Sequence, residues 1–163
     1  MKIWVMRHGE AGFNGPSDSQ RTLTPNGEKM AYLQGQWLAK RLSEQNRALD
    51  KIIVSPYTRT QQTYEQVMSG LQAAGFNQNC AKLLETWEGV TPSGDADNVV
   101  DYLDFLREEG AQNVLVISHL PLVFDLTQAL TEYQYAVHFY PAVIAEIERE
   151  KSGHLVTVAE SPK

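Results

Sequence analysis

The chain has 163 residues and a mass of 18.3 kDa, which is the size of one ordinary domain. Its apolar share of 42% and charged share of 21% are those of a globular protein, and they argue against a disordered chain, a collagen-like repeat or a coiled coil. Fourteen Lys and Arg against twenty Asp and Glu give a net charge of −6, which argues against non-specific binding to nucleic acid or to an anionic membrane.

The first strand and the first helix are predicted on either side of a polar loop. Residues 2–6, KIWVM, form a short apolar run that stops abruptly at polar residues, which is typical of a strand. After the loop, Thr24 is a favourable helix N-cap and Pro25 a favourable first helical residue. Apolar side chains then recur at helical spacing towards Asn46, which predicts an amphipathic helix covering one face of a sheet.

The same order of strand and helix follows in the next segment. Residues 50–54 contain the β-branched run IIV, which predicts a second strand. Ser55 and Pro56 repeat the pattern of a capping residue followed by proline, and they predict a second helix that ends around Gly75. A short strand is then expected over residues 81–84.

A third helix and a third clear strand are predicted in the following segment. Ser93-Gly94-Asp95 is a helix-starting segment and Gly110 a terminating residue, and the stretch between them has apolar side chains on one side. Residues 113–117, NVLVI, are the most strand-like run of the sequence. A further amphipathic helix is expected after Pro121.

The end of the chain has a different pattern. Residues 142–147 and 154–159 are strand-like runs joined by a polar turn, which predicts a hairpin. Strands that alternate with amphipathic helices indicate a mostly parallel sheet with helices on both faces, and the hairpin adds an antiparallel edge. We therefore expect an α/β fold of three layers, formed by a single domain over residues 1–163.

The sequence also carries information about compartment. Cys80 is the only cysteine, so the fold contains no internal disulfide and a cytoplasmic location is expected. The apolar run over residues 3–6 is too short for a signal peptide, and no other stretch approaches the ~20 apolar residues of a membrane span.

His138, His154 and Cys80 have no metal-ligand spacing, so no metal site is expected.

Unusual residues are concentrated at three junctions between a strand and a helix. Arg7 and His8 follow the first strand, Arg59 falls in the first turn of the second predicted helix, and His119 follows NVLVI. Ligands of open parallel sheets bind at the carboxyl ends of the strands, so these side chains can converge in one cationic pocket. A cation in a first helical turn is disfavoured by the helix dipole, by ~0.3 to 1 kcal/mol. An anion is therefore expected near Arg59.

Each of these residues also has an ordinary interpretation. A lone histidine at a strand end is usually packed or solvated, and an arginine there usually pairs with a local carboxylate. Two histidines and two arginines at three sheet termini of one small acidic domain make the functional interpretation the better one.

Four segments together resemble a known family. MRHGE over residues 6–10 resembles the RHG signature of the histidine phosphatase superfamily, the phosphoglycerate-mutase-like phosphatases. The other matching segments follow in the order expected for that family: RTLTPNG at 21–27, SPYTRTQQT at 55–63 and Ser118-His119. The short length and the sequence SHLPL at 118–122 are most similar to the small SixA-type protein phosphohistidine phosphatases.

The resemblance implies a covalent phosphohistidine mechanism. His8 would attack phosphorus through a neutral ring nitrogen, while its other nitrogen is held by a hydrogen bond. Arg7 and Arg59 would grip the non-bridging oxygens with their forked donors, and His119, if protonated, would be a further donor. Arg21 matches an additional substrate-side arginine, although it can equally be a loop residue in a surface ion pair.

Two roles remain open. Asn14 lies where the mutase-like pattern has an asparagine, but its glycine and proline neighbours also make it an ordinary turn residue. Mutase-like relatives have a glutamate general acid, and Glu85 and Glu88 are candidates that do not align unambiguously. Either glutamate can be only a solvated carboxylate.

The expected function is hydrolysis of phosphohistidine on a partner protein, such as a histidine phosphotransfer domain or a phosphocarrier. A phosphatase or mutase for small metabolites is the alternative within the superfamily, and a non-catalytic phosphohistidine-binding adaptor is a third. We expect a monomer without cofactor or metal, with neither nucleic acid nor membrane as a partner.

Overall fold

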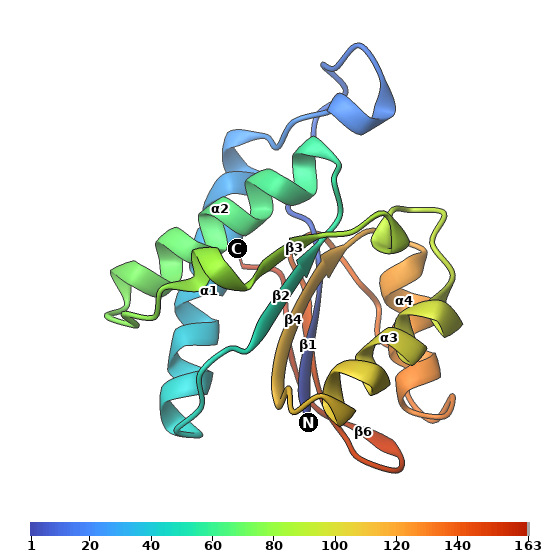
Figure 1. Cartoon of the computed structure of the whole chain (residues 1–163). Coiled ribbons are helices and arrows are strands. Elements are labelled where there is room, and N and C mark those ends of the chain that lie inside the picture. Colours follow the sequence, from blue (N-terminus) through green and yellow to red (C-terminus); the bar gives the residue numbers. More distant parts are fainter. Residues whose placement is uncertain (163) are drawn as a thin grey trace.

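A computed structural model describes residues 1–162 as a six-stranded sheet with helices on both faces (Figure 1). The strands lie in the order β3-β2-β4-β1-β5-β6. The pairs β1–β4, β2–β4 and β2–β3 are parallel, whereas β5 runs antiparallel to both β1 and β6. The predicted parallel sheet with an antiparallel edge is confirmed. The strands are β1 (Lys2–Arg7), β2 (Lys51–Val54), β3 (Leu84–Thr86), β4 (Asn113–Ser118), β5 (Ile144–Arg149) and β6 (Gly153–Ala159).

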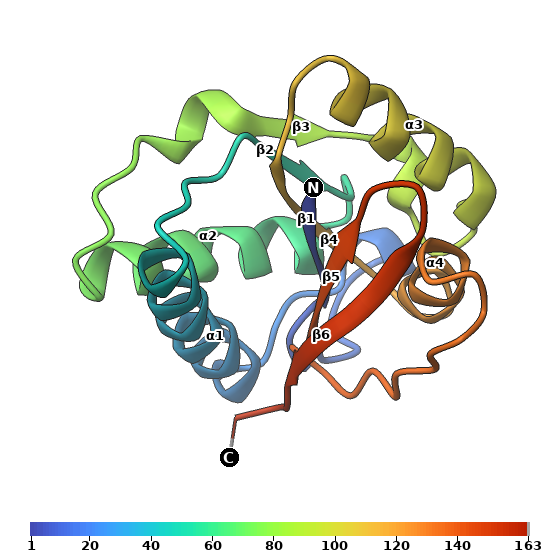
Figure 2. The same ribbon diagram turned by 90° about the horizontal axis from the view of Figure 1, so that it is seen from below.

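The helices form the outer layers of the fold. Figure 2 shows α1 (Pro25–Glu44) and α2 (Thr58–Ala73) on one side of the sheet, with α3 (Ala96–Glu108) and α4 (Leu122–Leu130) on the other. Successive residues of β1 point to opposite faces, as strand geometry requires. Trp4 accordingly packs with the core under α1 and α2, and Val5 packs with the core under α3 and α4. The three-layer α/β architecture expected from the sequence is confirmed.

Two predicted helix starts are confirmed in detail. The Thr24 hydroxyl accepts a hydrogen bond from the Gly27 amide at 3.0 Å, and Pro25 is the first residue of α1. The Asp95 carboxylate accepts from the Asp97 amide at 2.9 Å at the start of α3. Each side chain satisfies an amide that a helix start leaves without a partner in the helix.

The predicted start of the second helix is wrong by a few residues. The helix begins at Thr58 and its N-cap residue is Tyr57, which makes no capping hydrogen bond with its side chain. The Ser55 hydroxyl accepts from the Tyr57 amide at 3.3 Å, which lies before the first helical residue, and it is also 2.8 Å from the Nε2 atom of His119. Ser55 therefore makes a local contact ahead of the helix together with a tertiary one.

The short strand predicted over residues 81–84 is also displaced. Residues Cys80–Leu83 form a 3-10 turn, which the Asn79 side chain opens by accepting from the Ala81 amide at 3.3 Å. The strand β3 begins at Leu84, the first residue that pairs with Ile52 of β2.

The helices α1 and α2 cross at a pair of glycines. A Cβ atom on Gly35 would overlap the Val67 carbonyl, and one on Gly70 would overlap the Tyr32 carbonyl. The two backbones therefore touch directly, and this contact fixes the position of α2 on the sheet.

None of the helices within residues 1–162 combines the length and the apolar character needed to span a membrane.

Candidate active site

Three parallel strands bring the predicted residues to one edge of the sheet. Arg7 at the end of β1 is in register with Ser118 at the end of β4, and Val54 at the end of β2 is in register with Ile117. The His8 amide continues this pairing by donating to the Ser118 carbonyl at 3.0 Å. The loop over residues 9–24 lies beside the start of α2 at the same edge (Figure 1).

His8 is buried, with 7% of its surface exposed, and both of its ring nitrogens are engaged. Its Nδ1 atom lies 2.7 Å from the Gly9 carbonyl, which can only accept, so Nδ1 carries the proton. Its Nε2 atom accepts from the Arg59 Nε atom at 3.3 Å. Burial lowers the pKa of His8 to about 4, against the opposing effect of Gly9 and with a further contribution from Arg59 and Arg7. At neutral pH, Nε2 is therefore unprotonated and has a lone pair available.

Gly9 is required by the packing of this turn. Its amide donates to the Thr63 hydroxyl at 3.1 Å, and a Cβ atom on Gly9 would run into the Gly27 carbonyl at the start of α1. The glycine therefore lets the chain pass between α1 and α2 directly after His8, which aims the imidazole ring.

Arg59 lies beside the anion that the sequence leads us to expect. The guanidinium group donates from Nη1 to the Asp18 carbonyl at 2.6 Å and from Nη2 to the Asp18 carboxylate at 3.3 Å. The hydrogen bond from Arg21 lowers the pKa of Asp18, burial opposes this, and Arg59 lowers the pKa further, so this carboxylate is ionised at neutral pH. Asp18 thus offsets the charge of Arg59.

Arg7 and His119 complete the ring of side chains. Arg7 donates from Nη1 to the Phe139 carbonyl at 2.8 Å, and burial together with the charge of Arg59 lowers its pKa. The His119 ring lies edge-on to His8, with 5.2 Å between ring centroids. Burial first, and then His8 and Arg59, lower the pKa of His119 to about 3. The protonated His119 considered above is therefore not the state of the free protein at neutral pH.

The arrangement suits a tetrahedral oxyanion in front of His8. The guanidinium group of Arg59 contacts the Nε2 atom, and the charge of Arg7 acts on the same ring. The Nε atom of Arg7 and the Nδ1 atom of His119 are buried without a partner among the described residues. Buried polar atoms normally have hydrogen-bond partners, so these two atoms favour a ligand site. The site can hold phosphoryl oxygens while Nε2 faces the phosphorus atom.

The other two sequence candidates, Arg21 and Asn14, make their hydrogen bonds within their own loop. Arg21 donates to the Gly12 carbonyl at 2.8 Å and pairs with Asp18 at 3.0 Å, although its charge still contributes to lowering the pKa of His8. Asn14 is exposed and accepts from the Thr22 hydroxyl at 3.0 Å, as a turn residue does.

Neither glutamate candidate contacts the predicted site residues. Glu85 pairs with Lys51 at 3.1 Å and accepts from the Tyr102 hydroxyl. Glu88 is exposed in the short 3-10 turn Glu88–Val90.

Two features of the site were not predicted from the sequence: the ion pair of Asp18 with Arg59, and the contact of the Ser55 hydroxyl with His119. The spacing of Asp18 and Arg21, three residues apart, is a signal of an ion pair that the sequence contains. The partnership of Asp18 with Arg59 bridges 41 positions and has no local signal. The hydroxyl of Ser55 supports His119 across 64 positions and is likewise visible only in three dimensions.

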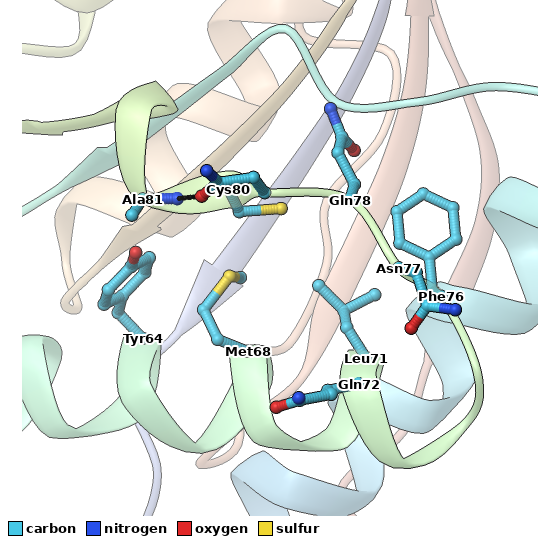
Figure 3. A pocket seen from close by; sticks show the side chains of 10 residues that line it. Tyr64, Met68, Leu71, Gln72, Phe76, Asn77, Gln78, Cys80 and Ala81 are labelled. Atoms are coloured by element: carbon cyan, nitrogen blue, oxygen red, sulfur yellow. Dashed lines mark hydrogen bonds between the residues drawn. The ribbon is translucent and has the colours of Figure 1, made fainter.

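A second cavity, of about 410 Å³, lies between α2 and residues 76–81 (Figure 3). Met68 and Leu71 point into it from α2, with amide side chains at its rim. Burial raises the pKa of the Cys80 thiol, which keeps it protonated and unreactive. The lining residues include no cation, so this cavity does not share the chemistry of the site at His8.

Within residues 1–162, no group of three His, Cys, Asp or Glu side chains has the arrangement that could hold a metal ion. The positive charge that acts on His8 comes from Arg59, Arg7 and Arg21.

Residues 3–103 match the histidine phosphatase superfamily (branch 1), and the chain belongs to this superfamily. The resemblance inferred from the RHG segment is thereby confirmed. A phosphohistidine phosphatase SixA homolog of Haemophilus influenzae is 45% identical over 148 residues, which cover 90% of this chain and 87% of that protein. Phosphohistidine phosphatase SixA of Escherichia coli is 36% identical over 154 residues, covering 94% of this chain and 89% of that protein.

A solved structure agrees with these sequence relatives. The protein histidine phosphatase SixA complexed with tungstate superposes with a TM-score of 0.84 at 34% identity, covering 97% of this chain and 96% of that one. The phosphoglycerate-mutase-like fold class is confirmed.

Asp18→Asn is expected to tighten the binding of inorganic phosphate, because Arg59 would no longer be neutralised by a carboxylate. An exposed ion pair contributes ~1 kcal/mol or less, so the inhibition constant of phosphate should fall by about two- to fivefold. Competitive inhibition at fixed pH and salt measures this change. Asp101→Asn, an exposed aspartate on α3, is the matched control. Weaker phosphate binding in Asp18→Asn would show instead that Asp18 positions Arg59 for the ligand.

Proposed function

We propose that the protein is a phosphohistidine phosphatase that transfers the phosphoryl group from a partner protein to His8 and then to water. The observation that carries this proposal is the imidazole of His8, whose Nδ1 atom is fixed by the Gly9 carbonyl while Nε2 meets Arg59. The relatives named phosphohistidine phosphatase support the same reaction.

The reaction has two displacement steps. In the first, Nε2 of His8 attacks phosphorus and a new P–N bond forms, while the P–N bond to the partner's histidine breaks and that ring, protonated at its other nitrogen, leaves as neutral imidazole. In the second, water attacks the phosphorus of the phosphoenzyme, the P–N bond to His8 breaks, and inorganic phosphate leaves. Arg7 and Arg59 stabilise the charge of the phosphoryl oxygens in both steps, and a neutral His119 has one N–H to donate.

The protonation states at the site favour phosphohistidine over phosphate esters. A phosphohistidine ring that carries a proton on its other nitrogen releases neutral imidazole, whose conjugate acid has a pKa of ~6.5, so its departure needs little help. An alkoxide, with a conjugate-acid pKa near that of water at ~15.7, needs a positioned acid. Asp18 is the carboxylate at Arg59, and its lowered pKa leaves it without a proton to donate. Glu85 is occupied by Lys51 and Tyr102.

Comparing substrates is the direct test of this proposal. A phosphorylated histidine phosphotransfer domain or phosphocarrier protein is expected to be hydrolysed with a kcat/KM at least about 10²-fold higher than that of sugar or glycerate phosphates, the scale that general-acid catalysis commands. The measurement is release of inorganic phosphate under matched conditions. Efficient ester hydrolysis with none of the phosphoproteins would favour the metabolite phosphatase, and phosphoprotein binding without turnover would favour an adaptor.

Chelator treatment is expected to leave the activity unchanged. Arg7 and Arg59 supply the positive charge that a metal ion would otherwise provide to the phosphoryl oxygens. Dialysis against EDTA followed by a phosphate-release assay tests this expectation. Activity that is lost and then restored by one defined metal ion would contradict it.

We also propose that the protein acts as a monomer in the cytoplasm. All of the predicted site residues come from one chain and converge without a second copy, which supports a monomer. The single cysteine, buried and free, fits a reducing compartment.

A further inference from the structure

A hollow of about 280 Å³ opens beside the candidate phosphoryl site. Arg7 is common to both, and Leu120, which directly follows His119, forms another part of the wall. The backbone of Phe139 joins the two regions, because its carbonyl accepts from Arg7. The complete lining is Arg7, Leu120, Phe124, His138, Phe139 and Tyr140.

The walls of this hollow expose apolar surface to solvent. Leu120 is 40% exposed and Tyr140 is 64% exposed, while Phe124 on α4 is half-buried. Exposed apolar groups that line a concavity mark sites of interaction, whereas single exposed apolar residues do not. Here they lie around one concavity whose inner end is a residue of the phosphoryl site.

A second hollow, of about 320 Å³, extends this surface along the chain. It shares His138 and Tyr140 with the first, and it reaches Leu155 and Val158 of β6. Glu160 is its one carboxylate. The two hollows together form a mostly apolar strip that begins at Arg7 and ends at the antiparallel edge of the sheet.

We propose that this strip is the docking groove for the phosphohistidine-bearing protein, with an apolar side chain adjacent to the phosphohistidine seated between Leu120 and Tyr140. This inference rests on the proposed function. The groove begins at Arg7, which also belongs to the phosphoryl site. A protein that presents its phosphohistidine to His8 must therefore place its neighbouring surface over the adjoining hollow. A small phosphate ester fills the phosphoryl site and has nothing to cover Leu120 or Tyr140.

The test compares a protein substrate with a minimal one. The variants are Leu120→Ser, Tyr140→Ser and the double variant, and Tyr133→Ser is the control, because Tyr133 is 70% exposed and lines neither hollow. The substrates are a phosphorylated histidine phosphotransfer domain, a phosphorylated phosphocarrier protein and N-phosphoimidazole. We expect the double variant to lose about tenfold or more in kcat/KM on the preferred phosphoprotein, mainly through KM. Its hydrolysis of N-phosphoimidazole should stay unchanged, as should both activities of the control.

Three outcomes would overturn the docking groove. Equal losses on the phosphoprotein and on N-phosphoimidazole would mean that Leu120 and Tyr140 support the catalytic geometry. Undiminished activity on both would mean that the groove binds nothing in the reaction. A wild-type dimer that the double variant converts to monomers, seen by sedimentation, would assign the groove to a second copy of this chain. Failure of the proposed function is distinguishable, because the wild-type protein itself would then hydrolyse neither phosphoprotein.

Discussion

His8→Ala is expected to abolish phosphatase activity, with a loss of roughly four to six orders of magnitude, as when other covalent enzymes lose their nucleophile. In the proposed mechanism, Nε2 of His8 is the atom that forms the bond to phosphorus. The Nε2 atom of the neighbouring His119 contacts the Ser55 hydroxyl instead. Removal of His8 therefore leaves a site that still binds an oxyanion and does not turn over.

Two measurements check this expectation for His8. Rapid quenching with a labelled phosphoprotein should trap an acid-labile phosphoenzyme in the wild-type protein and none in His8→Ala, while His154→Ala, an exposed histidine, serves as the control. Because burial lowers the pKa of His8 to about 4, the rate of phosphoenzyme formation should stay level at neutral pH and decline only as the pH falls through about 4. Turnover by His8→Ala at the wild-type rate would rule out the covalent mechanism.

Arg59→Ala is expected to lower kcat by about 10² to 10³-fold, which corresponds to ~2.7 to 4 kcal/mol for one preorganised donor. Arg59 donates to Nε2 of His8, and its guanidinium group can donate two parallel hydrogen bonds to phosphoryl oxygens. Its loss therefore weakens both the orientation of the His8 ring and the stabilisation of the phosphoryl charge. Arg59→Lys should recover only part of the rate, because an ammonium group cannot make the two-pronged contact.

Steady-state kinetics on a phosphoprotein separates these effects for Arg59. We expect the fall in kcat to exceed the rise in KM, since the charge stabilisation increases towards the transition state. Arg47→Ala is a suitable control because Arg47 pairs with Asn113, at the start of β4 and so at the opposite end of the sheet. Full restoration of activity by Arg59→Lys would mean that a point charge is sufficient.

The order of the elements could be predicted from the sequence because each one depends on local patterns. Thr24 and Asp95 open helices through hydrogen bonds to amides two or three residues away, and such contacts are visible in the sequence. The start of α2 was predicted too early, because the Ser55 hydroxyl accepts from the Tyr57 amide before the helix begins at Thr58. The contact of the same hydroxyl with His119, from another strand end, could not be predicted.

The residues of the candidate site could be predicted from the sequence, but their charge balance could not. Arg7, His8, Arg59 and His119 follow from the rule that parallel strands present their carboxyl ends at one edge. The electrostatic balance was not predictable, because it depends on Asp18 in a loop without regular structure over most of its length. The neutrality of His119 was also beyond sequence reasoning, because burial is its main cause.

The crossing of α1 and α2 at Gly35 and Gly70 bears on the precision of catalysis. His8 directly follows β1, whereas the guanidinium group 3.3 Å from its Nε2 atom belongs to the first turn of α2. In the proposed mechanism, a shift of about 1 Å between such groups can cost ~10²-fold in rate. The direct backbone contact limits how far α2 can move over α1. Two residues without side chains thus help to hold the helix that carries Arg59 in place.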